Sequence, residues 1–266
     1  MSTEIQYANN ATGSHTAQFY EGWWAGFSKE PNGEERMRMN FIVQTLDDLA
    51  ANKNLEILDM GCGRGWLAPF LSQYGKVTGV DFAPAGIAFA KQNFSEHGTF
   101  LLADANSPLL GLSEDRQFDV VVCSEVIEHV PDQLALLLQI NQLLPVNGLC
   151  ILTTPNGNIW PEFEQTRSRE TLQPIENWLR PAGLQFLLRE AGFALLRHEG
   201  RATYERFGHF RTFQHRKVRF LFQRLKLEHL YGRLVLPSAL YQVVAARKIR
   251  CLNLPVSQPD GDFLPK

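Results

Sequence analysis

The stretch Leu55–Gly65 constrains this chain most, because a short apolar run ends in Asp59 and is followed by glycines at alternate positions from Gly61. Such a run predicts a buried strand that passes through a tight loop into a helix. Glycine suits the loop because it adopts positive φ and lets a ligand lie against the backbone. Asp81 follows Gly61 by about twenty residues, where a nucleotide-binding strand–helix–strand unit places its ribose-binding acid. We therefore predict a nucleotide site.

The spacing of the glycines narrows the kind of nucleotide. Gly61-x-Gly63-x-Gly65 is not the G-x-G-x-x-G pattern of NAD enzymes, and it lacks the Gly-Lys-Ser/Thr ending of a P-loop. No Lys or Ser of the loop is placed to clamp a triphosphate. A nucleotide without phosphates therefore fits better.

The composition is that of an ordinary globular protein, with 266 residues, 44% hydrophobic and 20% charged. The formal net charge of −2 gives no global basic field, so we expect no nucleic-acid partner. Four widely spaced cysteines without a Cys-x-x-Cys pair predict a reduced, cytoplasmic protein with no zinc site. No signal peptide and no apolar run of ~20 residues is evident, so we expect no stable membrane insertion.

Predicted strands and helices alternate along most of the chain. Strands are expected at 55–60, 77–81, 99–104, 118–123, 148–153, 193–198 and 238–247, and helices at 34–51, 64–74, 83–93, 133–144 and 181–191, with Gly75 ending the second helix. This alternation predicts a parallel sheet with helices on both faces and ligands at the carboxyl ends of the strands. Four polar residues fall at those ends: Asp59, Asp81, Asp104 and Ser124.

The regions on either side of this alternation differ from it in their amino-acid composition. We expect an N-terminal helical cap or lid at 1–52, a main domain at 53–250 and an irregular tail at 251–266. Aromatic residues at helical spacing near residue 20 predict a helix that packs on the body, or a lid in which Tyr20 and Trp24 close over a ligand. A basic and aromatic insert at 200–236, with a helix around 215–231, has three possible roles: a solvated edge, a wall of the substrate pocket, or a contact with anionic lipid.

Several motifs together resemble those of class I S-adenosylmethionine-dependent methyltransferases, especially the ubiquinone- and menaquinone-biosynthesis and natural-product group. The resemblance rests on Ile57–Gly65, Val80-Asp81, Ala103-Asp104, Phe118–Val130, Gly148–Asn156 and Glu190–Phe193. It implies a Rossmann-like, doubly wound α/β sheet of seven strands, mostly parallel, whose last strand is inserted antiparallel between its neighbours. It also implies S-adenosylmethionine as the cofactor.

The same resemblance assigns roles to the matching positions. The loop Gly61, Cys62 and Gly63 would lie against the methionine part of the cofactor, and Asp59 would orient that loop. Asp81 would accept both ribose hydroxyls, and Ser124 would offer its carbonyl to the cofactor ammonium. The adenine would lie by Phe82, Asp104 and Ala105.

The segment after the fourth strand holds the candidates for acid–base chemistry. On a helix, Glu125, Glu128 and His129 would share one face. They could brace the loop, or His129 or Glu125 could act as a general base. A metal site of the Glu-x-x-Glu-His kind is a third interpretation, but the region around Glu176 supplies no second His, so we expect no metal.

These observations favour a methyltransferase that acts on an O or N atom of a small molecule, such as a secondary metabolite or a quinone-like acceptor, with Tyr20, Trp24 and Trp160 near the acceptor. A lipid or glycan acceptor is the alternative within this class. A non-catalytic module that binds S-adenosylmethionine is the alternative from another class. The sequence leaves monomer and homodimer open.

Overall fold

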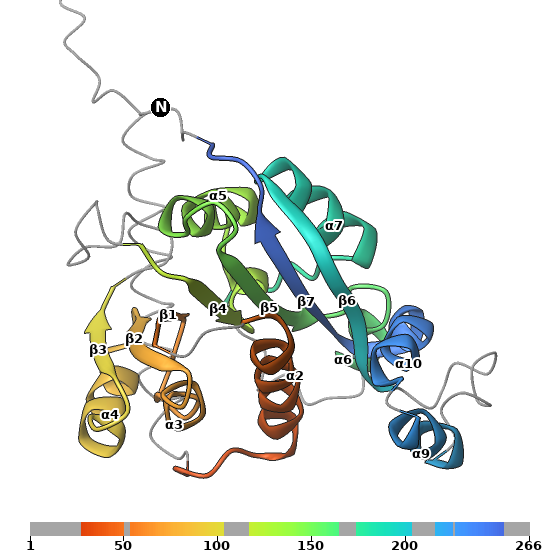
Figure 1. Cartoon of the computed structure of the whole chain (residues 1–266), viewed down its shortest axis with the longest axis horizontal. Helices are drawn as coiled ribbons and strands as arrows, with labels where there is room; N and C mark the ends of the chain where they lie inside the picture. Colours follow the sequence, from red (N-terminus) through yellow and green to blue (C-terminus); the bar gives the residue numbers. More distant parts are fainter. Residues whose placement is uncertain are drawn as a thin grey trace, which may run out of the picture.

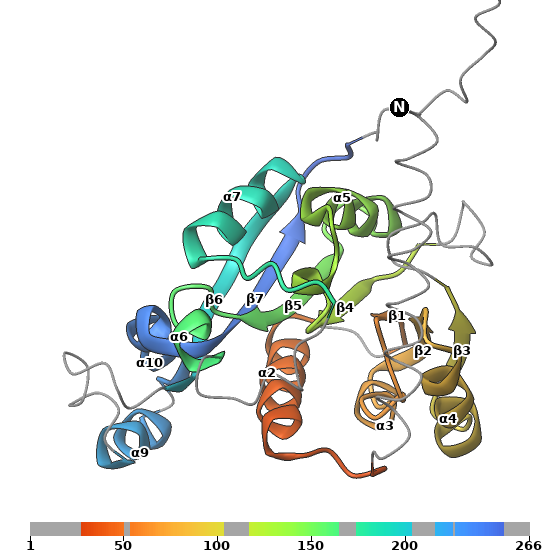
Figure 2. The same cartoon turned by 180° about the vertical axis from the view of Figure 1, so that it is seen from behind.

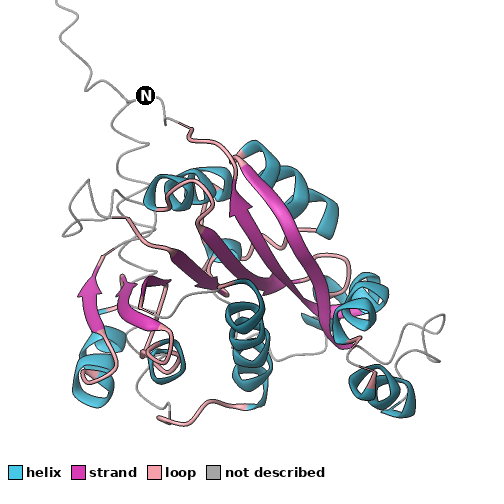
Figure 3. Ribbon diagram, in the orientation of Figure 1, coloured by secondary structure: helices cyan, strands magenta, loops and turns pink. Residues whose placement is uncertain are grey.

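The computed structural model describes residues 28–50, 54–103, 117–164, 174–203, 216–225 and 227–252. Their centre is a seven-stranded sheet with the order β3-β2-β1-β4-β5-β7-β6 (Figures 1 and 3). The strands are β1 Leu55–Met60, β2 Gly75–Asp81, β3 Thr99–Leu102, β4 Val120–Ser124, β5 Leu149–Pro155, β6 Phe193–Thr203 and β7 Ala239–Lys248.

The directions of the strands confirm the predicted sheet. Strands β3, β2, β1, β4 and β5 pair in parallel, and β7 lies antiparallel between β5 and β6. Successive strands run outward from β1 to β3 on one side, and then from β4 to β5 on the other. The order reverses between β1 and β4, and ligands in open α/β sheets bind outside the carboxyl ends of the strands at such a point.

Helices cover both faces of the sheet (Figures 1 and 2). One side carries α2 Gly33–Leu49, α3 Ala68–Leu71 and α4 Pro84–Phe94, and the other carries α5 Gln133–Leu143 and α7 Pro181–Glu190. The short α6 Trp160–Glu164, α9 Arg216–Arg224 and α10 Glu228–Val235 lie near the end of β6. None of the helices described here is both long and apolar enough to span a bilayer.

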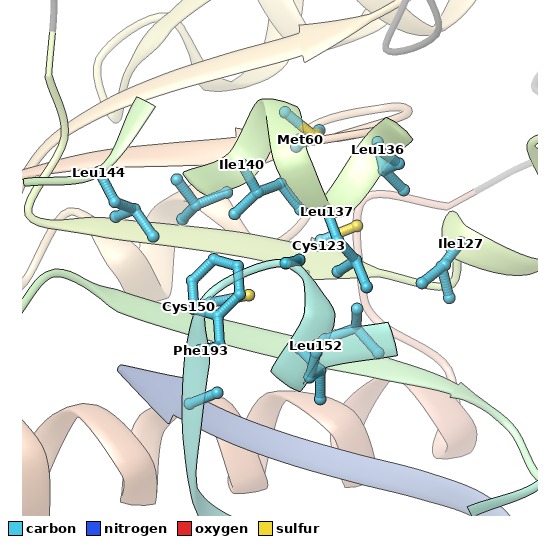
Figure 4. Close-up of a cluster of buried hydrophobic side chains, with 14 of the residues drawn as sticks. Met60, Cys123, Ile127, Leu136, Leu137, Ile140, Leu144, Cys150, Leu152 and Phe193 are labelled. Atoms are coloured by element: carbon cyan, nitrogen blue, oxygen red, sulfur yellow. The ribbon is translucent and has the colours of Figure 1, made fainter. Parts of the chain in front are cut away.

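Each face of the sheet has its own apolar cluster, which explains why the central strands are continuous apolar runs. Val120 to Cys123 of β4 are all buried, as are all seven residues of β5. Parallel strands that are covered on both faces require such runs. Figure 4 shows the cluster on the α5 side, where Leu137 and Ile140 pack over Cys123, Cys150 and Leu152.

Two of the predicted helix ranges are wrong. The helix expected at 64–74 is only α3, and Gly75 begins β2 rather than ending that helix. A Cβ on Gly75 would collide with the carbonyl of Leu55, so the glycine is needed where β2 meets β1. The single helix expected at 215–231 is two helices, α9 and α10.

Four of the predicted site residues lie outside the described residues, namely Tyr20, Trp24, Asp104 and Ala105. The assignments made for them therefore stay predictions.

Candidate active site

Three predicted site residues meet at one edge of the sheet. Asp59 is the penultimate residue of β1, Asp81 ends β2 and Ser124 ends β4. Asp59 pairs with Gly79 of β2 and Val122 of β4, so β1 lies centrally at this edge. The carboxyl ends therefore gather these polar groups at the switch point, as the sequence predicts.

The glycine loop after β1 has left-handed backbone at all three glycines, with φ of 74° at Gly61, 52° at Gly63 and 77° at Gly65. This region favours glycine because it has no Cβ. A Cβ on Gly61 would collide with the side chain of Val126, and one on Gly65 would lie 2.8 Å from the Cβ of Ala90. Two of the glycines are thus required by packing within the protein as well as by backbone conformation.

Asp81 holds the loop through its carboxylate. One oxygen accepts the N–H of Gly63 at 2.8 Å, and the other accepts the N–H of Ala83 at 2.8 Å. A carboxylate offers about four acceptor positions, so this group can hold the loop and bind a ribose at the same time.

Burial, followed by the charge of Asp81, raises the pKa of Asp59 to about 7. These residues fit an adenosyl ligand with an uncharged ribose.

A buried ion pair joins the loop to α2. The guanidinium of Arg64 donates to both carboxylate oxygens of Glu35, at 2.7 and 2.9 Å, and its Nε donates to the carbonyl of Ser28. The side chains of Arg64 and Glu35 are only 1% and 6% exposed. Burial opposes ionisation of Glu35, but the bonds from Arg64 and the backbone of Asn32 keep its pKa below the ordinary value. Glu35 also completes the capping box that begins α2.

The segment after β4 is not the α-helix that the sequence suggests. Glu125 has left-handed backbone, with φ of 57°, and only a 3₁₀ turn at Ile127–His129 follows. Left-handed backbone at a residue other than glycine is uncommon and often lies at a functional site. The prediction that Glu125, Glu128 and His129 share one face of a helix is therefore wrong.

Both glutamates of this segment are nevertheless held in place by threonines of β5. Thr153 donates to Glu125 at 2.8 Å, and Thr154 donates to Glu128 at 2.9 Å. Arg38 of α2 lies 3.8 Å from the second oxygen of Glu125. Burial is the largest cause that raises the pKa of each glutamate to about 7. The segment thus holds two carboxyl groups that titrate near neutrality.

The imidazole of His129 is fixed in one tautomer. Its Nδ1 lies 2.8 Å from the carbonyl oxygen of Ile175, which can only accept, so Nδ1 carries the proton. Its Nε2 therefore has a lone pair, and it lies 3.6 Å from an oxygen of Glu128. Burial lowers the pKa of His129, although the Ile175 carbonyl and nearby acids oppose that shift. The ring is thus neutral near pH 7, as a general base requires.

Aromatic groups from β7 and α6 adjoin this segment. The Tyr241 hydroxyl donates to Glu34 of α2 at 2.8 Å, and its ring lies 5.3 Å from that of Trp160. Burial, followed by the charge of Glu125, raises the pKa of Tyr241, so this phenol stays protonated. Trp160 is buried, and its contact with the acceptor stays a prediction. The sequence predicts a strand at Tyr241 but does not assign this residue to the site. Tyr241 lies next to the site because it pairs with Pro155 of β5, which is distant in sequence.

No group of three or more His, Cys, Asp or Glu side chains is placed to hold a metal ion within the ranges that the structure describes.

Glu128→Gln should stabilise the protein at pH 8 by about 2 kcal/mol and have little effect at pH 5. The folded pKa of Glu128 lies above its ordinary value. Its protonated form thus contributes stability at low pH, and this contribution is lost as the pH rises through about 7. Glutamine resembles the protonated glutamic acid and can still accept the hydrogen bond from Thr154. Urea unfolding at both pH values measures the difference, with the exposed Glu30→Gln as the control. Equal effects at pH 5 and pH 8 would contradict the raised pKa.

Comparisons with known proteins identify the family of this chain. A family model described as a methyltransferase domain matches residues 34–228. A ubiquinone biosynthesis O-methyltransferase of Pasteurella multocida is 29% identical over 157 residues, which cover 52% of this chain and 62% of that protein. Its counterpart from Pseudomonas aeruginosa is 30% identical over 182 residues, 64% of this chain and 77% of that one. The chain thus spans only about three fifths of the Pasteurella relative.

A solved structure extends the comparison to the fold. Magnesium protoporphyrin IX methyltransferase from Synechocystis PCC 6803, solved with bound SAH, superimposes with a TM-score of 0.58. The superposition covers 90% of this chain and 98% of that one, at 15% sequence identity. At that identity the likeness concerns the fold alone. The family match covers most of the chain, and Asp81 and the glycine loop lie at the carboxyl ends of β2 and β1, where open α/β sheets bind ligands. The chain therefore belongs to the methyltransferase domain family, among the class I methyltransferases that use S-adenosylmethionine.

Proposed function

We propose that this protein transfers a methyl group to a hydroxyl oxygen of a small molecule, such as a quinone-like phenol. The observation that carries the proposal is the fixed tautomer of His129, whose Nε2 has a lone pair beside the end of β4. An amine acceptor needs only alignment, whereas a hydroxyl acceptor benefits from a base. The names of the Pasteurella and Pseudomonas relatives, which are O-methyltransferases, also favour oxygen.

S-Adenosylmethionine, when bound, supplies a methyl group that is already activated by the sulfonium. The task of the chain is therefore to align the acceptor, to exclude water and to take up one proton. As the acceptor oxygen is methylated, Nε2 of His129 takes its proton. The resulting imidazolium lies 3.6 Å from the carboxyl of Glu128, which favours the charged ring when ionised.

The backbone around Glu125 contributes positioning. Ser124 and Thr153 bond each other through their hydroxyls at 2.8 Å, and the N–H of Glu125 donates to the carbonyl of Thr153. These bonds fix the end of β4 against β5. We infer that the Ser124 carbonyl is thereby held toward the cofactor ammonium, and that Glu125 is available as a second proton acceptor.

The experiment pairs binding with product formation. Calorimetry with S-adenosylhomocysteine, and with NAD as the control, tests the cofactor. Mass spectrometry of a panel of catechols, phenols, amines, glycans and lipids tests the acceptor. Methyl addition to phenols supports the proposal, whereas addition only to amines, glycans or lipids would replace the acceptor class. Binding of S-adenosylhomocysteine with no methylation across the panel would favour a non-catalytic module.

His129→Ala should slow methyl transfer roughly a hundredfold, at the low end of general-base effects, without weakening cofactor binding. Because the pKa of His129 is lowered, wild-type activity should fall only as the pH drops below about 6.5. The variant should lose this limb of the pH profile, and added imidazole should restore part of the rate. His97→Ala is the matched control, since His97 follows α4, toward the opposite edge of the sheet. Unchanged turnover in His129→Ala would make its role structural.

A further inference from the structure

We propose that α9 and α10 form a surface that docks on anionic lipid bilayers. The surface is an exposed apolar patch, the α9–α10 patch, made of Phe220, Leu221, Leu225, Leu227 and Leu230. These five residues are 42% to 62% exposed. Five other large apolar residues in the described ranges are exposed, but they are scattered over the chain. Scattered apolar residues need no explanation, whereas five within residues 220–230, on and between two helices that contact each other, indicate a contact surface.

Packing within the protein does not account for the patch, because other side chains of the same helices perform that role. The ring of Phe222 on α9 lies 5.6 Å from that of Tyr231 on α10. Both residues line a cavity of about 470 Å³ between these helices, α2 and the end of β6. Val235 of α10 is buried. The inward side of the helix pair is thus in use, while the residues of the α9–α10 patch remain in contact with water.

The charge of α9 identifies the partner. Residues 216–225 include Arg216, Lys217, Arg219 and Arg224 and no acid, although the whole chain has a net charge of −2. The basic charge is therefore local to the helix that also carries Phe220 and Leu221. A short amphipathic helix that is basic and more polar than apolar overall is typical of the bilayer interface, where basic residues attract anionic headgroups.

The position of the patch suits a planar partner. Figures 1 and 2 both place α9 at the edge of the molecule, outside α10 and at the end opposite α4. The α9–α10 patch lies on the β6 side of the sheet, whereas the glycine loop joins β1 to the region of β2. Docking and cofactor binding therefore use different parts of the protein, and this proposal does not depend on the identity of the methyl acceptor.

Vesicle flotation tests the proposal with the full chain. Vesicles of phosphatidylcholine with phosphatidylglycerol should carry the protein, and vesicles of phosphatidylcholine alone should carry it at least tenfold less. Binding should also weaken as salt is raised, because basic residues near a charged surface are screened.

Two double variants distinguish binding through the α9–α10 patch from nonspecific adsorption to vesicles. Phe220→Ser with Leu225→Ser should lower partition onto the anionic vesicles at least tenfold, and so should Lys217→Glu with Arg219→Glu. Phe186→Ser is the matched control, since Phe186 is a similarly exposed aromatic residue on α7, and it should bind as the wild type does. Circular dichroism and thermal unfolding verify that each variant is folded.

Failure of the folded wild type to float with anionic vesicles would overturn the proposal, as would equal binding by the Phe220/Leu225 variant. Sedimentation velocity tests whether the patch instead forms a contact between two copies of the chain. A dimer that the same substitutions abolish, without any vesicle binding, would show that the patch binds a second copy of the chain instead. Normal methyl transfer with no flotation would reject the docking surface and leave the proposed function intact.

Discussion

Arg64→Ala should lower the free energy of unfolding by about 3–5 kcal/mol, the cost of leaving one partner of a buried ion pair without the other. Arg64 binds both oxygens of Glu35, and both side chains are almost fully buried. Without the guanidinium, the Glu35 carboxylate would lose two charged hydrogen bonds in a site that water does not reach. The connection between the glycine loop and α2 would be lost as well. Urea unfolding at pH 7 measures the effect.

The control for this prediction is an exposed pair of the same kind. Lys76 lies 3.1 Å from Glu56, and its side chain is 85% exposed. Lys76→Ala should therefore change stability by no more than about 0.5 kcal/mol. Joint replacement, Glu35→Leu with Arg64→Met, should recover much of the loss because no charge is left buried alone. A single Arg64→Ala variant as stable as the wild type would contradict the role of the pair.

The pH dependence gives a second test of the same pair. The pKa of Glu35 is lowered in the folded protein, so its ionised form contributes stability above the ordinary pKa of a glutamate. That contribution is lost as the pH falls through the lowered pKa. Arg64→Ala should remove this acid-sensitive part of the stability curve. The stability difference between wild type and variant should therefore narrow at acid pH.

Local patterns predicted the parts of the fold that local forces determine. The apolar run of β4 requires burial on both faces, and the acid at the end of β2 follows from the length of one strand–helix–strand unit. Asp59, Asp81 and Ser124 therefore lie at the predicted edge. The antiparallel β7 came from the resemblance rather than from periodicity, because alternation of residues does not reveal strand direction.

Features that depend on distant pairing could not be predicted in this way. Arg64 reads as the first residue of a helix, and nothing near it in sequence indicates that it binds Glu35. After β4, the expected helix would place Glu125, Glu128 and His129 on one face, but the left-handed backbone of Glu125 interrupts it. The fixed tautomer of His129 depends on the carbonyl of Ile175, which is far along the chain. These contacts hold the side chains on which the proposed function depends, and only the folded structure brings them together.

Asp81→Ala should weaken the binding of S-adenosylhomocysteine by about 2–4 kcal/mol, or roughly 30-fold to 900-fold. The substitution removes the acceptor predicted for the ribose. It also leaves the N–H groups of Gly63 and Ala83 without the carboxylate that now binds them. Loss of a ligand contact and loosening of the glycine loop thus act in the same direction. Isothermal titration calorimetry of the folded variant measures the affinity.

Asp119→Ala is the matched control for Asp81→Ala. Its carboxylate also accepts a backbone N–H, that of Glu56 at 2.9 Å, but Asp119 precedes β4 at the opposite edge of the sheet. This variant should bind S-adenosylhomocysteine as the wild type does, even if it is somewhat less stable. Affinity that is unchanged in folded Asp81→Ala would reject the ribose assignment.

Asp81→Asn separates the charge of this group from its shape. The amide retains one acceptor oxygen, so its affinity for S-adenosylhomocysteine should lie between those of the wild type and Asp81→Ala. Because the Asp81 charge helps to raise the pKa of Asp59, that pKa should fall below about 7 in the variant, while burial keeps it above the ordinary value. Asp59 stabilises the folded protein at low pH, and this contribution is lost as the pH rises through its folded pKa. Because that pKa is lower in the variant, the contribution should be smaller there than in the wild type. NMR titration measures the pKa of Asp59 in both proteins. The same pKa in Asp81→Asn as in the wild type would show that the two carboxyl groups at the strand ends do not interact.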